Sequence, residues 1–133
     1  MTPEAASYMT AADRALSDAR VVFTANLPHQ AARLAYYAQF HAAQALIFER
    51  TGKIAKTHKG VGRQFHLLAK AERSFPPGLA AELSSAYKYK EFADYDTDQA
   101  TPITVVQATD AIATAERFVA AVRQAIASPP TVP

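Results

Sequence analysis

Apolar residues recur along most of this chain at steps of three and four positions, the spacing that places them on one face of a helix. The pattern is most regular between residues 105 and 126, where polar residues fill the remaining positions. The apolar stripe there consists of Val105, Ala108, Ile112, Ala115, Val119, Val122 and Ile126. No stretch shows the alternation with a period of two that marks a half-buried strand. The pattern therefore predicts an all-α protein.

Capping residues and prolines divide the chain into five predicted helices. Their expected bounds are about 3–25, 28–51, 58–73, 77–94 and 102–128. Thr2-Pro3 and Thr101-Pro102 are each interpreted as an N-cap followed by proline at the first helical position, and Gly52 as a C-cap. Because no internal repeat is present, residues 1–128 are expected to form one domain, followed by a disordered tail at 129–133.

The second predicted helix is apolar on nearly its whole circumference. From Arg33 to Leu46 it consists mostly of alanine and aromatic residues, with few polar side chains such as Gln39 and Gln44. A surface helix keeps one polar face, so this helix must be covered on several sides. It is predicted to be the central helix of a bundle, or to lie at both the core and a subunit interface. The second alternative favours a homodimer.

Composition narrows the classes of function. The 133 residues suffice for one domain with its own core, and 30 of them are alanine, the best helix former. The absence of cysteine excludes disulfides, thiolate metal sites and cysteine nucleophiles. No secretory signal is visible, and no apolar run reaches the roughly 18 residues of a membrane span. We therefore expect a cytoplasmic protein that has no membrane partner.

Sequence signals for cofactor chemistry are missing. The four glycines form no phosphate-binding loop ahead of a helix, and nothing marks a nucleophile elbow. Neither His58 nor His66 has a carboxylate three or four residues further along. His41, on the apolar second helix, is interpreted as a satisfied core histidine. We expect no cofactor, no metal site and no classical hydrolase chemistry.

Positive charge is concentrated between residues 50 and 73, although the net charge of the chain is only +2. That segment holds seven Lys or Arg residues and one acid, Glu72. Such a cluster is the footprint expected for a phosphate backbone or an acidic protein partner, although an ordinary solvated face has the same composition. With Arg33 added, the candidate RNA- or partner-binding residues are Arg33, Lys53, Lys56, His58, Lys59 and Arg63.

Two charged residues continue the apolar stripe of the fourth predicted helix. Lys90 and Asp94 are four positions apart and follow Leu79, Leu83 and Ala86 on the same face. Burying them is costly unless they pair. One interpretation is a local ion pair whose lysine stem covers apolar surface. The other is a charged group held at a cleft or a dimer interface, where it could meet a phosphate.

Three segments, in this order, resemble the HEPN family of small α-helical domains. They are Arg33-x-x-Tyr36-Tyr37-Ala38-x-Phe40-His41-Ala42-Ala43, then Lys56-Thr57-His58-Lys59-Gly60-Val61 with Phe65 following, then Lys90-x-x-Ala93-Asp94-Tyr95-Asp96. The resemblance covers roughly residues 11–122. It implies an up-and-down bundle of four or five helices that is usually a homodimer. It also implies a small nucleotidyltransferase as partner, because many relatives form a toxin–antitoxin pair with such a protein.

The catalytic relatives are metal-independent ribonucleases. In them, an arginine and a histidine four to six residues later come together with the same two residues of the second subunit, across the dimer interface. Arginine would stabilise charge at phosphorus, and histidine would act as general acid or base toward the ribose 2′-hydroxyl. In this sequence Lys90 occupies the position of the arginine, and the residue five positions later is Tyr95 and not histidine. Lysine lacks the bidentate fork, and tyrosine, with a pKa near 10, is a poor proton acceptor near neutrality. The candidate catalytic residues are Lys90, Asp94 and Tyr95.

Three functions are compatible with these residues. The favoured hypothesis is a toxin-like binding or regulatory subunit of a HEPN–nucleotidyltransferase pair with a degraded ribonuclease motif. The alternative is a metal-independent endoribonuclease toxin that acts at a homodimer interface, with RNA guided by the basic residues. The third is a helical scaffold that has no role in nucleic-acid binding.

Overall fold

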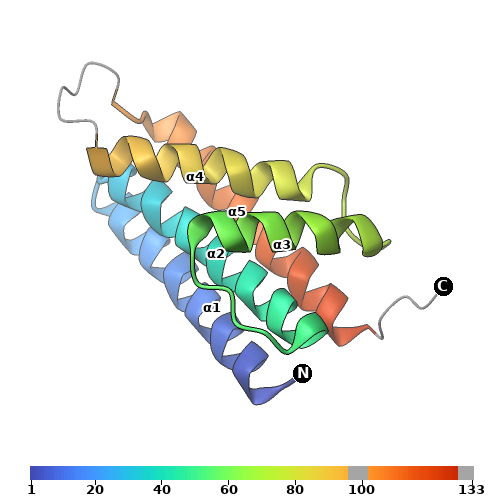
Figure 1. The fold of residues 1–133 in the computed structure, drawn as a ribbon. Helices are drawn as coiled ribbons and strands as arrows, with labels where there is room; N and C mark the ends of the chain where they lie inside the picture. Colours follow the sequence, from blue (N-terminus) through green and yellow to red (C-terminus); the bar gives the residue numbers. More distant parts are fainter. Residues whose placement is uncertain (96–101, 129–133) are drawn as a thin grey trace.

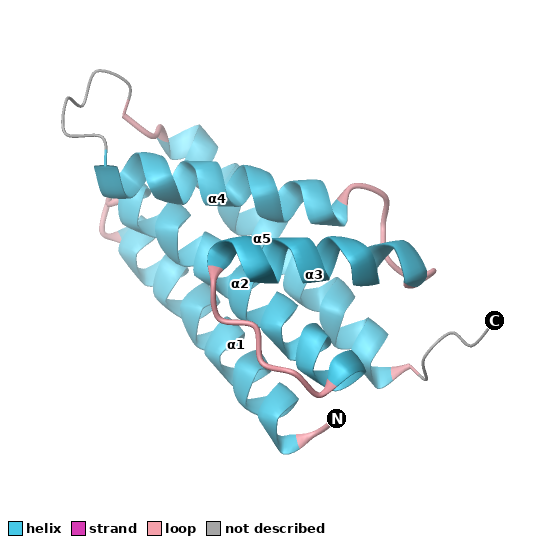
Figure 2. Cartoon of the chain, in the orientation of Figure 1, coloured by secondary structure: helices cyan, strands magenta, loops and turns pink. Residues whose placement is uncertain are grey.

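The structure, a computed structural model, describes residues 1–95 and 102–128, apart from the side chains of residues 93 and 95 (Figure 1). The described residues form five helices and no strand, which confirms the all-α prediction (Figure 2). The helices are α1 (Pro3–Thr24), α2 (Pro28–Thr51), α3 (His58–Ala71), α4 (Leu79–Tyr95) and α5 (Val105–Ala127). The expected tail at residues 129–133 lies outside the described residues.

Helix α2 is the centre of the bundle and packs against all four other helices. In Figure 1, α1 runs beside it, α3 and α4 cross in front of it, and α5 lies behind. The prediction of a central helix is therefore confirmed. The residues of α2 that stay partly exposed near its middle are Arg33, Leu34, Tyr37 and His41. Because this chain itself covers most of α2, the apolar sequence of that helix does not by itself require a second subunit.

Several predicted helix ends are confirmed by their caps. The Oγ1 atoms of Thr2 and Thr57 accept hydrogen bonds from the backbone amides of Ala5 (3.1 Å) and Gly60 (2.9 Å), which otherwise lack partners in the first turn. Gly52 ends α2 with a φ of 71°, a left-handed conformation that glycine adopts without steric cost. Thr57, as the N-cap, places His58 at the first position of α3.

The predicted start of α5 at Thr101-Pro102 is wrong. Thr104 is the N-cap: its Oγ1 accepts from the amide of Gln107, and its own amide donates to Gln107 Oε1. Ile103, just before the cap, is buried with Ala108 in a small cluster on α2, which fixes the entry of the chain into the helix. The reciprocal capping box and this apolar contact outweigh the proline signal two residues earlier.

Two other helix bounds differ from the predicted ones. Helix α4 begins at Leu79 and not at Pro77, since Gly78 has a φ of 86° and cannot lie within a right-handed helix. Helix α3 ends at Ala71, two residues short of the predicted end. Both differences lengthen the connection between α3 and α4.

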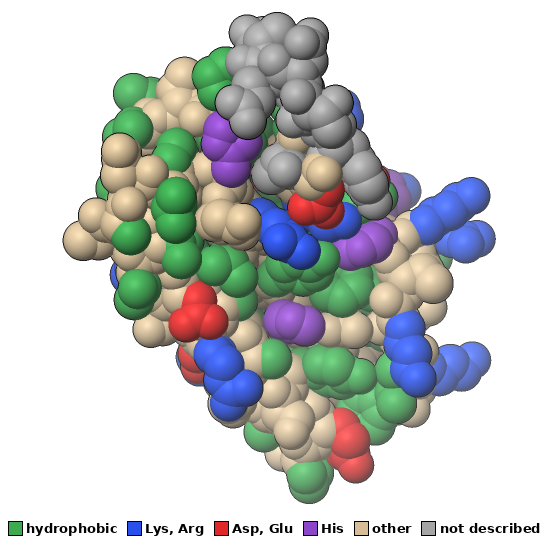
Figure 3. All heavy atoms as spheres, turned by 90° about the vertical axis from the view of Figure 1, so that its left-hand side faces the viewer, with side chains coloured by type: hydrophobic (Ala, Val, Ile, Leu, Met, Phe, Trp, Pro, Cys, Tyr) green, Lys and Arg blue, Asp and Glu red, His purple; other side chains and the backbone are tan. Residues whose placement is uncertain are grey.

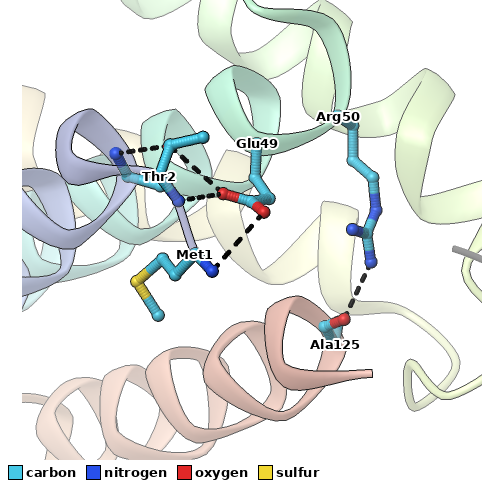
Figure 4. A network of polar contacts seen from close by, with 6 residues as sticks. Met1, Thr2, Glu49, Arg50 and Ala125 are labelled. Carbon is cyan, nitrogen blue, oxygen red and sulfur yellow. Dashed lines mark hydrogen bonds and ion pairs between the residues drawn. The ribbon is translucent and has the colours of Figure 1, made fainter. Parts of the chain in front are cut away.

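The end of α2 farthest from Arg33 is fixed by polar contacts with both ends of the chain (Figure 4). The carboxylate of Glu49 accepts from the backbone amide of Thr2 at 2.8 Å and lies 3.9 Å from the amino group of Met1. Arg50 donates from Nη2 to the carbonyl of Ala125 at 2.8 Å. These contacts hold α1 and α5 against α2, so the opposite half of α2 is presented on a rigid frame. Within the described residues, no helix has both the length and the apolar character to cross a bilayer.

Candidate functional site

The predicted ion pair between Lys90 and Asp94 is formed, and it belongs to a larger cluster. Lys90 Nζ lies 2.7 Å from Asp94 Oδ2, and Arg33 of α2 places its Nε 3.2 Å from Oδ1 of the same carboxylate. The side chains of Lys90 and Asp94 are 9% and 16% exposed, whereas that of Arg33 is 43% exposed. One carboxylate thus faces two cations, of which Lys90 is mostly buried.

His58 enters this region from the start of α3. Its Nδ1 lies 2.6 Å from the hydroxyl of Tyr36, whose side chain is almost fully buried in α2. Burial lowers the pKa of His58 below its ordinary 6.5 and the charge of Lys90 lowers it further, while Glu91 and Asp94 oppose the shift. Burial, together with neighbouring Tyr87, Tyr37 and Glu91, raises the pKa of Tyr36. Both rings are therefore neutral at pH 7.

Aromatic rings surround His58 and connect it to Lys90. The centroid of the imidazole lies 5.0 Å from those of both Phe40 and Tyr87. Lys90 Nζ lies 5.9 Å from the Tyr87 centroid, within the range of a cation–π contact. A histidine and a lysine from distant parts of the sequence therefore share one aromatic neighbour.

The His58–Tyr36 pair borders a hollow between α3 and α4. This hollow has a volume of about 420 Å³, and its lining includes Lys59, Arg63 and Lys88. A second hollow of about 650 Å³ shares Lys88 and adds His66 and Lys70. We call these two adjoining hollows the basic groove. Lys and Arg side chains gather at the right of Figure 3, on the side where α3 and α4 lie.

The candidate binding residues from the sequence fall into three places. Arg33 lies at the Asp94 carboxylate, and His58, Lys59 and Arg63 line the basic groove. Lys53 and Lys56 are exposed in the connection between α2 and α3 and line neither hollow. The charge cluster predicted from residues 50–73 is therefore split by the fold.

Arg50 of that charged segment has a structural role. Its Nε donates to Glu72 Oε1 at 2.7 Å, and both side chains are about one-tenth exposed. With its second bond to the carbonyl of Ala125, Arg50 joins the end of α2 to the ends of α3 and α5. It is therefore not available to a phosphate.

Of the three candidate catalytic residues, Lys90 and Asp94 lie together as described. Tyr95 ends α4, and its side chain lies outside the described residues. Two residues of the site, Tyr36 and Tyr87, were not among the candidates. Tyr87 is three residues before Lys90 on the same helix face, a spacing that could have indicated it. Tyr36 is part of the aromatic motif of α2, but only the tertiary structure shows that its hydroxyl meets His58.

His41 lies at the edge of this region, where its ring has a hydrogen-bond partner as expected but is partly exposed and not in the core. Its Nδ1 lies 2.9 Å from Gln44 Oε1, and Gln44 in turn donates to the carbonyl of Ala55 at 2.9 Å. In the described part of the chain, no three His, Asp or Glu side chains are grouped so that they could hold a metal ion. The described groups are suited to binding an anion and to transferring a proton at His58.

Comparison with known proteins agrees with this architecture. The model of the HEPN domain family matches residues 5–125. A protein of Methanocaldococcus jannaschii, "Putative toxin MJ0605", is 32% identical over 115 residues, which are 86% of this chain and 83% of that protein. The resemblance inferred from the three sequence segments is thereby confirmed, and the chain belongs to the HEPN domain family.

Proposed function

We propose that this protein is a toxin-like HEPN subunit that acts by binding a partner, a small nucleotidyltransferase, and that its ribonuclease motif is degraded. The observation that carries this proposal is the Asp94 carboxylate, which lies within ion-pair distance of both Lys90 and Arg33. The similarity to a protein named as a toxin supports the general class.

The ion pair between Lys90 and Asp94 argues against a role of Lys90 in stabilising a phosphate transition state. The lysine is nearly buried and its Nζ is 2.7 Å from a carboxylate oxygen, so stabilising a phosphorane would require exchanging that close partner for the substrate. Arg33, which has the fork that Lys90 lacks, faces the same carboxylate. The cluster is therefore better suited to linking α2 and α4 than to catalysis.

The basic groove is the surface proposed for the partner. Lys59, Arg63 and Lys88 are exposed around it, and they would complement an acidic surface on the nucleotidyltransferase. A homodimer remains part of this proposal, with the partly exposed Tyr37 and His41 of α2 as the face that would meet its equivalent.

The experiment is co-expression with the product of a neighbouring nucleotidyltransferase gene, followed by affinity purification and light scattering. We expect a stable complex that is weakened by the double variant Lys59→Glu, Arg63→Glu. Arg14→Glu, an exposed charge reversal on α1, is the matched control and should leave the complex intact. A monomer that ignores the nucleotidyltransferase would overturn the proposal.

A metal-independent endoribonuclease toxin is the second candidate, and the position of His58 favours it. The imidazole that is missing after Lys90 in the sequence is supplied from α3, at the border of a hollow lined by cations. A neutral histidine there has the protonation state that a general base requires. RNA cleavage in EDTA that His58→Ala abolishes, and that Arg14→Ala at an exposed position of α1 does not, would establish this activity. Intact RNA with every variant would exclude it under those conditions.

A further inference from the structure

A pocket of different character lies on the other side of α4. It has a volume of about 320 Å³ and is lined by residues of α2, α4 and α5, with Gln39 as the contribution from α2. Helix α4 packs mainly on α2 and only slightly on α5, which leaves this space open. We call it the α4–α5 pocket. It shares no residue with the Lys90–Asp94–Arg33 cluster.

Gln39 is an unusual residue for such a place. Its side chain is 1% exposed, yet its Oε1 atom is buried without a hydrogen-bond partner among the described residues. The Oε2 atom of Glu82, which also lines the pocket, is buried and unpaired in the same way. Buried acceptors are normally satisfied because an unmade hydrogen bond destabilises the fold. The pocket therefore presents two acceptors for which no described residue supplies a donor.

The charge of the pocket defines what those donors must be. Its charged lining residues are Glu82 of α4 and Asp110 of α5, and both are acidic. The hollows of the basic groove are instead lined by lysine and arginine. A phosphate or a carboxylate would be repelled here. A cation that carries several N–H donors fits both the charge and the unpaired acceptors.

We propose that the α4–α5 pocket binds a guanidinium group. A guanidinium has five N–H donors in a planar fork, so it can meet the amide oxygen of Gln39 and the two carboxylates at once. It is more weakly hydrated than an ammonium ion and stacks on aromatic rings, and the ring of Tyr89 lines the pocket. The hydroxyls of Ser85 and Thr114 complete the polar lining.

The volume of the pocket limits the size of the ligand. Pockets for small molecules span roughly 300–1,000 Å³, and this one is close to the lower limit. A guanidinium on a short alkyl stem fits this space. It can come from a free small molecule or from an arginine side chain in a peptide, and these two sources are separated by the experiment.

The test is a ¹H–¹⁵N NMR titration of the full chain with two guanidinium probes. Agmatine represents a free small molecule, and the capped peptide acetyl-Gly-Arg-Gly-amide represents an arginine side chain. Putrescine, a diamine without a guanidinium, is the ligand control. We expect the side-chain amide signals of Gln39 and the backbone signals of Ser85 and Thr114 to move with a guanidinium probe and not with putrescine. The probe that binds more tightly identifies the source.

Three variants locate the site. Glu82→Gln and Asp110→Asn keep the shape of the side chains but remove one charge each. Glu82→Gln should weaken binding about tenfold, and Asp110→Asn about threefold. Gln39→Leu removes the unpaired amide with little change in volume and should also weaken binding while the protein stays folded. Asp18→Asn, an exposed acid on α1, is the matched control and should bind like the unchanged protein.

Several results would overturn the proposal. One is the absence of any shift at about 10 mM probe, well above the 1 mM affinity that about 4 kcal/mol of binding free energy supplies. Another is equal binding of agmatine and putrescine, which would show that the pocket does not recognise the guanidinium group. A third is equal affinity of the Asp110→Asn and Asp18→Asn proteins. Asp110 is exposed, so its variant is expected to fold even if substitution of Glu82 does not.

Discussion

Asp94 and Arg33 join two helices through a single carboxylate. Arg33 Nε reaches Oδ1 from α2, while Lys90 holds Oδ2 from within α4. The lysine and the aspartate are spaced as an ordinary pair on one helix, and the arginine adds a connection between helices. The carboxylate is therefore the member of the cluster that both cations contact.

Removal of Asp94 should cost more stability than removal of Lys90. Asp94→Asn leaves a mostly buried lysine beside an arginine without their shared counter-charge, and we expect a loss of about 2–4 kcal/mol in the free energy of unfolding. Urea denaturation followed by circular dichroism measures this loss. Lys90→Met is the matched variant: Arg33 still neutralises Asp94, and the loss should stay below about 1 kcal/mol. Equal losses would show that Asp94 does not serve both cations.

The stability of the protein should depend on the ionisation of His58. Its pKa is lower in the folded protein than the ordinary 6.5, so the unfolded chain binds the proton more readily. The stability that this difference contributes is complete above about pH 6.5 and is lost as the pH falls through 6.5 toward the lower pKa of the folded state. Urea midpoints between about pH 7.5 and 5.5 would show the decline. The His58→Gln protein should show a flatter profile over that range; an unchanged slope would contradict this assignment.

Arg50 should be important for stability and unimportant for binding. It bridges Glu72 and the carbonyl of Ala125 from a site that is about one-tenth exposed. Arg50→Ala should lower the free energy of unfolding by about 2–4 kcal/mol, since it leaves a buried carboxylate and a carbonyl unpaired. Arg50→Lys should rescue only part of this, because one ammonium group lacks the fork that reaches both partners. Full rescue by lysine would mean that charge alone matters here.

If RNA binds this protein, the basic groove should set the salt dependence of its affinity. For single-stranded RNA, log affinity falls with log salt, and each phosphate that a variant no longer neutralises makes this slope shallower by about 0.7. Lys59→Gln and Arg63→Gln should each show this reduction in filter-binding or fluorescence anisotropy measurements. Lys53→Gln should not, because Lys53 lies outside the groove. A reduction shared equally by all three variants would show that the interface extends beyond the groove onto the α2–α3 connection.

Helix positions and the central place of α2 could be predicted because they depend on local signals and on one long apolar sequence. Thr2, Thr57 and Gly52 act within a few residues of themselves, so their caps were identified from sequence alone. Thr101-Pro102 is the exception: the structure shows that the capping box of Thr104 and the burial of Ile103 start the helix later.

The site was only partly predictable for a different reason. The Lys90–Asp94 pair lies within one helix turn and follows from spacing, whereas Arg33 and His58 arrive from other helices. No pattern in the sequence states which residue meets the hydroxyl of Tyr36. The unpaired Oε1 atom of Gln39 could not be predicted either, since the sequence of an apolar helix does not indicate whether the amide of a glutamine has a hydrogen-bond partner.

The central position of α2 also determines which parts of the protein can open independently. Because α1, α3, α4 and α5 all rest on α2, the backbone amides of α2 can exchange with solvent only when several helices separate together. Helix α4 has little contact with α5, so an opening that separates α4 from α2 would leave the α1–α2–α5 packing in place. Such a local opening would expose Lys90 and remove one wall from both the basic groove and the α4–α5 pocket. A ligand bound on either side of α4 would therefore also oppose such an opening.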